Sequence, residues 1–217
     1  MVQTKTVDGP LRRGQLSNLA GFDYDKSSLS SIEAGVRLAI TRGIADPARI
    51  GITGMSQGSD IAIYALLHSN LFAAVAMSQC CLDATRYARV GPLAARYFYS
   101  VGYPKMTDRD EAFWKQVSLV PNARRMHAPM LLQIADQEYA SALVTYTALR
   151  EVDAPVDMFV FPNEDHVKWQ PAHRLAIYRR ALDWFDFWLR GKRAVARPSE
   201  IKHWEALRQS LHEHLPN

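Results

Sequence analysis

Gly54, Ser56 and Gly58 have the spacing of the motif Gly-x-Ser-x-Gly, in which the serine could act as a nucleophile. The motif follows a short apolar stretch and precedes a segment with helical spacing, so we expect a sharp strand-to-helix turn. Glycines on both sides of such a turn remove side chains that would clash, and the serine hydroxyl stands exposed above the sheet. The backbone N–H of Gln57 would then lie at a helix N-terminus, where it could donate to an oxyanion. The pattern predicts a nucleophile elbow.

A serine nucleophile requires a general base and a carboxylate that orients the base. Asp136 directly follows the apolar segment MLLQIA, and His166 follows the segment VDMFVF through a short polar loop. In hydrolases built on a parallel sheet, the order along the chain is serine, acid, histidine, each at the carboxyl end of a strand. We therefore predict a catalytic triad of Ser56, Asp136 and His166, and expect Asp136→Asn to lower turnover by several orders of magnitude.

Three other acidic residues compete for the position beside His166. Glu138 is close to Asp136 but lies further from the strand end, and Asp165 directly precedes the histidine, where solvation would explain it. Asp60 falls in the first turn of the expected nucleophile helix, where the helix dipole favours a carboxylate without any catalytic role. The residues favour Asp136 but leave open whether a neighbour orients His166.

Short apolar runs alternate with longer amphipathic segments, which is typical of βα units around a parallel sheet covered on both faces. The expected strands are 49–53, 73–78, 130–135 and 156–161. The expected helices are 34–41, introduced by a capping box of Ser30 and Glu33, then 57–68, 141–152 and 171–189. The sequence therefore predicts an α/β fold in which strand ends carry the three triad residues.

Two segments depart from this alternation. Residues 81–128 are irregular and rich in Arg, Tyr and Phe, which would fit a partly helical insertion above the sheet. Residues 193–217 contain a separate amphipathic pattern beyond Pro198. We expect a catalytic domain over residues 1–192 and a C-terminal helical extension over residues 193–217.

Composition excludes several classes of protein. Hydrophobic residues make up 48% of the 217 residues and charged residues 22%, which indicates one globular domain with a buried core. The net charge of +4 comes from basic residues scattered among acidic ones, so we expect no nucleic-acid partner. No apolar run reaches the length of a membrane span, and the first residues lack the apolar stretch of a signal peptide. We expect no membrane partner and a cytoplasmic location.

Metal and disulfide sites are not predicted. Cys80 and Cys81 are adjacent, so they cannot join distant segments and lack the spacing of a structural zinc site. We expect two reduced thiols near a strand end. The histidines other than His166 lie away from strand ends, and surface or capping roles explain them. We therefore expect neither a metal nor a cofactor.

The sequence around the triad residues resembles the catalytic domain of the prolyl-oligopeptidase family. The resemblance rests on IADPARIGITGMSQGSDIA around Ser56, IADQEY around Asp136 and PNEDHVKW around His166. A closer likeness, to the lasso-peptide isopeptidases of that family, rests on LFAAVAMSQCC, AFWKQVSLVPNA and MFVFPNEDHVKWQPAHRLAIYRRALDWFDFWLRGK. It extends to about Lys192 and implies hydrolysis of the isopeptide bond between an N-terminal amine and an acidic side chain, which opens a threaded peptide ring.

The sequence departs from the family pattern in two ways. Ser59 stands where members usually carry glycine. The resemblance also implies an N-terminal β-propeller and several strands before the elbow, one of which leads into the loop that supplies a second oxyanion donor. Residues 1–48 show no convincing run of strands. We therefore expect an apparently N-terminally truncated α/β-hydrolase sheet that lacks the first strands of the fold, with an exposed edge through which a homodimer could form.

Three functional hypotheses follow. The first is a serine hydrolase that cleaves peptide or isopeptide bonds through an acyl-enzyme, with a lasso peptide as one candidate substrate. The second is a small-molecule esterase with the same triad, which substrate profiling would separate from the first. The third is a non-catalytic remnant that binds a peptide or a partner chain; the missing oxyanion loop favours it and the three intact triad positions oppose it.

Overall fold

The computed structural model describes residues 20–85, 91–100, 102–126, 128–193 and 196–214. Its strands all run parallel in one four-stranded sheet with the order β1-β2-β3-β4. The strands are β1 (Gly51–Met55), β2 (Ala74–Ser78), β3 (Met130–Ala135) and β4 (Val156–Phe161). The predicted parallel sheet is confirmed, and the bounds of β3 and β4 match the prediction. Among the described strands β1 has a neighbour on one side only, and the expected homodimer through this edge stays a prediction.

β1 begins two residues later than predicted because a short helical turn precedes it. This turn, η2 (Pro47–Arg49), is capped by Asp46, whose carboxylate accepts from the backbone N–H of Ala48 at 2.9 Å. The other oxygen of Asp46 accepts from Arg49 Nε at 2.6 Å. The turn therefore includes Arg49, which the apolar pattern had assigned to the strand.

Seven α-helices surround the sheet in the described part of the chain. They are α2 (Asp23–Thr41), α3 (Gln57–His68), α5 (Pro92–Ser100), α6 (Glu111–Val117), α7 (Tyr139–Arg150), α8 (Pro171–Arg190) and α9 (Pro198–His214). The predicted capping box at Ser30 is wrong, because α2 already begins at Asp23. Glu33 instead accepts a hydrogen bond from the Ser69 hydroxyl at 2.6 Å, which joins α2 to the end of α3.

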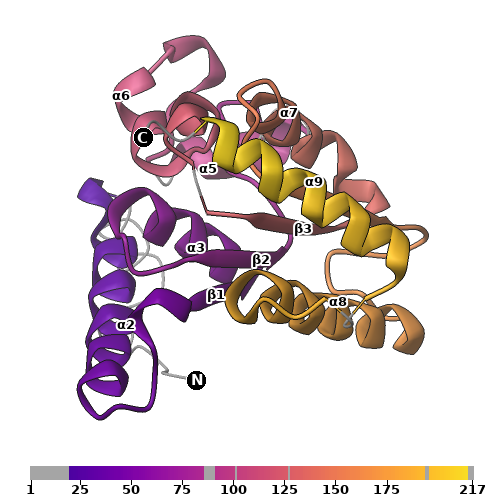
Figure 1. The fold of residues 1–217 in the computed structure, drawn as a ribbon. Helices are drawn as coiled ribbons and strands as arrows, with labels where there is room; N and C mark the ends of the chain where they lie inside the picture. The colour runs from indigo at the N-terminus through magenta and orange to yellow at the C-terminus, as the bar shows by residue number, and fades with distance from the viewer. Residues whose placement is uncertain (1–19, 86–90, 101, 127, 194–195, 215–217) are drawn as a thin grey trace.

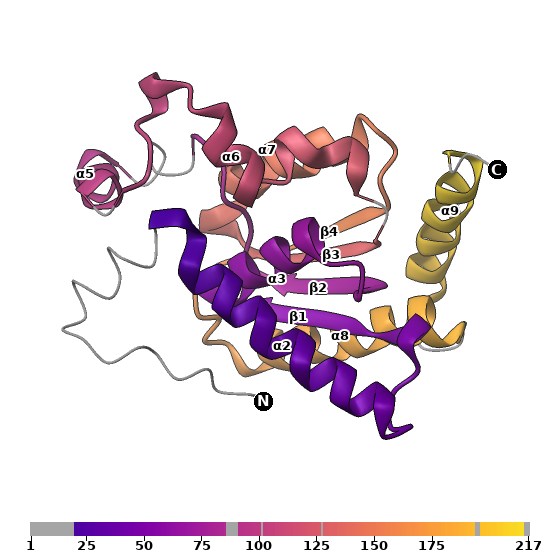
Figure 2. The ribbon, with the colours of Figure 1, turned by 90° about the vertical axis from the view of Figure 1, so that its left-hand side faces the viewer.

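The sheet separates two apolar cores, as expected for strands covered on both faces. Val75 and Met77 of β2 belong to the larger core beneath α2, α3, α6 and α7, whereas Ala76 between them belongs to the core beneath α8 and α9. Leu131 of β3 faces α8 in the same alternation, which follows from the two-residue period of a strand. Figure 2 shows α7 above the strands and α8 below them.

The C-terminal helix packs against α8. Trp204 of α9 is fully buried, and its ring meets that of Trp184 of α8 edge to face at a centroid distance of 5.2 Å. Its indole N–H donates to Asp157 of β4 at 2.8 Å. Figure 1 shows α9, in yellow, next to α8. The predicted amphipathic helix is present, and the domain boundary at residue 192 stays a prediction.

The segment between β2 and β3 is partly helical, as the sequence predicted. It contains α5, α6 and the short helical turns η3 (Met106–Asp108) and η4 (Val120–Arg125). Figure 2 shows α5 standing away from the sheet, beyond the carboxyl end of β1. Cys80 and Cys81 lie at the start of the segment, and the expectation of two reduced thiols stays a prediction. Both side chains are buried.

A partly buried carboxylate lies where α2 packs on α3, and it predicts a pH-dependent stability. Burial, and then the nearby carboxylate of Asp60, raise the pKa of Asp25 from 3.8 to about 6. The folded chain therefore binds this proton more tightly than the unfolded chain. The stabilisation is complete below the unfolded value of 3.8 and is lost as the pH rises through about 6.

Asp25→Asn is expected to remove this dependence. At neutral pH the substitution removes a buried charge, so the free energy of unfolding should rise by roughly 1–3 kcal/mol. Urea unfolding of both chains at several pH values between 4 and 7 measures the effect. Parallel stability curves for the two chains over this range would contradict the assignment.

Candidate active site

The sharp turn between β1 and α3 is formed at Ser56, as the sequence predicted. Ser56 lies between β1 and α3 with φ 56° and ψ −129°, a conformation that non-glycine residues rarely adopt. The turn is tight enough that a Cβ atom on Gly54 would overlap the backbone carbonyl of Gly58. A Cβ on Gly58, in contrast, would meet nothing within 4 Å. The close approach therefore explains one of the two motif glycines, not both.

His166 lies beside this serine, although β1 and β4 are the two outer strands of the sheet. Its Nε2 atom is 3.0 Å from Ser56 Oγ, although the two residues are 110 positions apart in the sequence. The ring is carried by the loop that follows β4, and its side chain is 41% exposed. The structure thus brings together the predicted nucleophile and the predicted base, with the ring open to a substrate.

The carboxylate that contacts the ring belongs to Glu138, not to Asp136. Glu138 Oε1 lies 2.6 Å from His166 Nδ1, and the carboxylate is largely shielded from solvent. With Nδ1 protonated, Nε2 is left as an acceptor for the Ser56 hydroxyl, which is the tautomer that a general base needs. The expected contact between Asp136 and His166 is therefore not made.

Asp136 is used for a different purpose. Its carboxylate accepts from the backbone N–H groups of Asn163 at 2.7 Å, Gln137 at 2.9 Å and Glu164 at 3.4 Å. These bonds, the one from Asn163 above all, hold the pKa of Asp136 below its ordinary value. Asp136 thus ties the end of β3 to the loop that carries His166.

A short helical turn explains the displacement of the acid. After β3 the chain enters η5 (Asp136–Glu138) before α7 begins. This turn directs Asp136 toward the backbone of the neighbouring loop and brings the side chain two residues later under the imidazole. Strand-end reasoning located the right loop, but the sequence carries no signal for the turn that selects Glu138.

A second carboxylate anchors the far side of the histidine loop. Glu164 is 0% exposed and accepts from the backbone N–H of Trp169 at 2.7 Å and of Gln170 at 3.2 Å. It also contacts His173 Nδ1 of α8 at 2.7 Å. Although burial opposes it, these hydrogen bonds hold the pKa of Glu164 below its ordinary value. The loop is therefore fixed on both sides of His166.

Gln57 is the first residue of α3, directly after the nucleophile. First-turn N–H groups of a helix have no partner within the helix, and the helix dipole makes this end attractive to negative charge. The backbone N–H that was predicted as an oxyanion donor therefore starts from a suitable position. Within the described residues no group of three His, Cys, Asp or Glu side chains could hold a metal ion.

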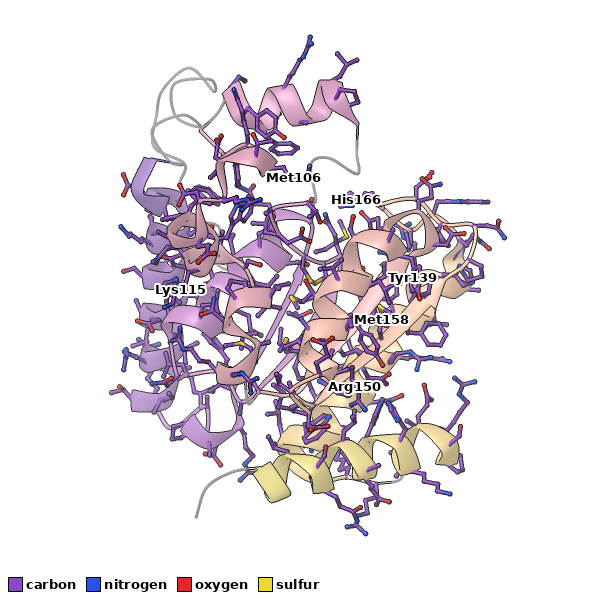
Figure 3. The ribbon with its side chains drawn as sticks, turned by 90° about the horizontal axis from the view of Figure 1, so that it is seen from above. Met106, Lys115, Tyr139, Arg150, Met158 and His166 are labelled. Atoms are coloured by element: carbon purple, nitrogen blue, oxygen red, sulfur yellow. A yellow bond between two sulfur atoms is a disulfide. The ribbon has the colours of Figure 1, made fainter. Side chains whose placement is uncertain are left out.

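Several exposed apolar residues are neighbours in sequence of the proposed triad residues. Met55 precedes Ser56, Tyr139 follows Glu138, and Val167 and Trp169 follow His166 in its loop. All four are exposed, Trp169 to 64%. Figure 3 shows Tyr139 on the same side of the molecule as His166.

No helix in the described part of the chain has the length and hydropathy needed to cross a membrane.

Comparison with known proteins shows which proteins the chain resembles. The chain is 43% identical over 170 residues to the lasso peptide isopeptidase AtxE2 of Asticcacaulis excentricus, a match that covers 77% of this chain and 24% of that protein. The structure of AtxE2 without ligand superposes with a TM-score of 0.86 and 37% identity, over 92% of this chain and 31% of that one. A variant of AtxE2 with Astexin3-dC4 bound gives the same TM-score over 93% of this chain and 31% of that one.

A more distant structure shares the fold. The acylaminoacyl peptidase of Pyrococcus horikoshii superposes with a TM-score of 0.66 at 23% identity, over 82% of this chain and 29% of that one. These neighbours confirm the α/β-hydrolase architecture. This chain spans about a quarter of the length of the curated relative it matches. Residues 16–192 match the model of the prolyl oligopeptidase family. The chain belongs to the prolyl oligopeptidase family.

Proposed function

We propose that this chain carries the catalytic centre of a serine hydrolase that cleaves peptide or isopeptide bonds, with Ser56 as nucleophile, His166 as general base and Glu138 as the orienting acid. The proposal rests chiefly on the two consecutive contacts of 3.0 Å from Ser56 to His166 and 2.6 Å from His166 to Glu138. Both lie within the range needed for proton transfer. Glu138 replaces the predicted Asp136 in the triad.

The mechanism follows from these contacts. His166 Nε2 accepts the hydroxyl proton as Ser56 Oγ attacks the carbonyl carbon, and the negative charge that forms on the oxygen is met by the N–H of Gln57. Glu138 stabilises the positive charge that develops on the ring. The imidazolium then gives its proton to the leaving amine, and a water molecule, activated by the same base, hydrolyses the acyl-enzyme.

An isopeptide bond is the substrate class that the comparisons support. AtxE2 is a lasso peptide isopeptidase, and a structure of one of its variants has Astexin3-dC4 bound. For this chain we propose the same class, an isopeptide bond within a peptide ring. The exposed apolar side chains around His166 would suit contact with the apolar surface of such a peptide. A small-molecule esterase uses the same triad, and ester turnover without isopeptide cleavage would identify it.

A fluorophosphonate probe tests the proposed triad without knowledge of the substrate. We expect the purified chain to be labelled at Ser56, and expect labelling to be lost in Ser56→Ala and lowered by several orders of magnitude in His166→Ala. A folded chain that reacts no faster than its Ser56→Ala variant would reject the hydrolase and favour a binding role. If the chain reacts with the probe, its cleavage of isopeptide-linked peptides and of linear peptides of the same sequence can be compared. Cleavage of the isopeptide-linked peptides alone would indicate an isopeptidase, and cleavage of both a general peptidase.

A further inference from the structure

A buried glutamine follows β2 at the carboxyl edge of the sheet. Gln79 is 7% exposed, and its backbone has a φ of 148°, in a region that strongly favours glycine. The residue before it, Ser78, pairs in register with Met55, which precedes the nucleophile. Because adjacent strands lie about 4.8 Å apart, Ser56 and Gln79 leave neighbouring strands side by side. A polar residue with a strained backbone is therefore buried next to the nucleophile.

The side-chain amide of Gln79 has no hydrogen-bond partner among the described residues. Its Oε1 atom is shielded from solvent, and no donor in this part of the chain reaches it. Gln133 of β3 is a useful comparison, because it is also buried and its Oε1 atom also lacks a donor in the described part of the chain. The amide nitrogen of Gln133, however, donates to the carbonyl of Ile177 at 3.1 Å. Since buried polar side chains are nearly always satisfied, Gln79 points to a partner that binds from outside the fold.

The chemistry of a carboxamide indicates what this partner is. The side chain of glutamine offers N–H donors and a carbonyl acceptor, which together complement the C=O and N–H of a peptide group. A simple ester offers an acceptor but no donor, so it can satisfy only half of the amide. Strained backbone conformations cluster at sites of binding and catalysis, where the bound molecule benefits from them. Gln79 therefore suits a peptide better than a simple ester.

We propose that Gln79 is a specificity-determining residue, whose side-chain amide forms hydrogen bonds with a backbone peptide group of the substrate next to the bond that Ser56 attacks. The inference rests on the proposed function of this site and narrows it to substrates with a peptide group beside the scissile bond. Gln79 takes no part in proton transfer. It supplies partners for polar groups of the peptide that lose water on binding, and it lowers the stability of the chain without substrate.

Two probes that react at Ser56 test the proposal without any need for turnover. One is an alkyl fluorophosphonate, which contains no amide, and the other is a peptidyl phosphonate, which carries backbone amides next to the phosphorus. Gln79→Met keeps the length of the side chain but removes the amide. The ratio of the peptidyl to the alkyl labelling rate should fall by about 10- to 30-fold in this variant, because the peptide loses two hydrogen bonds. A folded Gln79→Met chain with the ratio of the unmodified chain would overturn the proposal.

Urea unfolding separates this role from a structural one. Gln79→Met replaces buried polar atoms that lack partners with apolar ones, so the midpoint of unfolding should stay the same or rise. Gln133→Met is the matched control, because it removes a buried glutamine whose amide has a hydrogen bond in the fold. Its midpoint should fall, while the ratio of labelling rates should stay that of the unmodified chain. An equal fall of the ratio in both variants would show that the effect is not specific to Gln79, and would overturn the proposal.

Gln79→Gly decides the question if Gln79→Met does not fold. Glycine adopts a φ of 148° without strain and has no amide, so the ratio of labelling rates should fall as well, and an unchanged ratio would overturn the proposal. An unmodified chain that reacts with neither probe would reject the proposed function. Calorimetric titration of the unmodified and Gln79→Met chains with an isopeptide-linked peptide would then decide the role of Gln79, since equal affinities would overturn it.

Discussion

Glu138→Gln is expected to slow reaction at Ser56 by roughly 10³- to 10⁴-fold while the chain stays folded. The amide is nearly isosteric with the carboxylate that lies 2.6 Å from His166 Nδ1. It can present its N–H₂ group to the ring, which favours the wrong tautomer, and it carries no charge to stabilise the imidazolium. The rate of fluorophosphonate labelling, or kcat/KM with an activated ester, measures the loss.

Asp136→Asn is the matched comparison. The two carboxylates are two residues apart in the same turn, but Asp136 accepts only from backbone N–H groups. Asparagine keeps one oxygen acceptor, so the loop that carries His166 should keep its conformation but become less rigid. The rate of labelling at Ser56 should therefore fall by less than about tenfold. A larger loss in Asp136→Asn than in Glu138→Gln would return the acid to the position that the sequence favoured.

The two parts of the triad that sequence reasoning located depend on long-range regularities. Parallel strands that are buried on both faces appear as continuous apolar runs, which is why β3 and β4 could be bounded to the residue. Polar residues that follow such runs must gather at one edge of the sheet. Ser56 and His166 meet there because the strands are parallel, so the carboxyl ends of β1 and β4 point in the same direction.

The features that could not be predicted from the sequence depend on local backbone geometry, for which several conformations are compatible with the same residues. Asp136 and Glu138 differ by two positions, and only the course of η5 decides which side chain reaches the ring. The same holds at the start of α2, where serines compatible with either a cap or a helix interior lie inside the helix. Ser31 is an example, because its hydroxyl bonds back to the carbonyl of Ser27.

Gly54→Ala is expected to disrupt the elbow, with a loss of about 2–4 kcal/mol in the free energy of unfolding and at least a 100-fold slower labelling of Ser56. The added methyl group would overlap backbone atoms of Gly58 and Ser59, which no side-chain rotation can relieve. Either β1 or the first turn of α3 must then shift. Ser56 lies between these two elements and already has an unfavourable positive φ of 56°. Such a shift would therefore change the position of the Ser56 side chain.

Gly58→Ala separates this steric requirement from the motif itself. A Cβ at position 58 meets nothing within 4 Å, and the residue lies in the first turn of α3, where alanine is favoured over glycine by up to about 1 kcal/mol. We expect the variant to be as stable as the unmodified chain or more so, with labelling within about threefold. Equal damage from both substitutions would mean that the second glycine is needed by the bound substrate or the transition state, since the resting elbow leaves room for a methyl group there. The comparison therefore measures how much of the Gly-x-Ser-x-Gly pattern belongs to the fold and how much to the reaction.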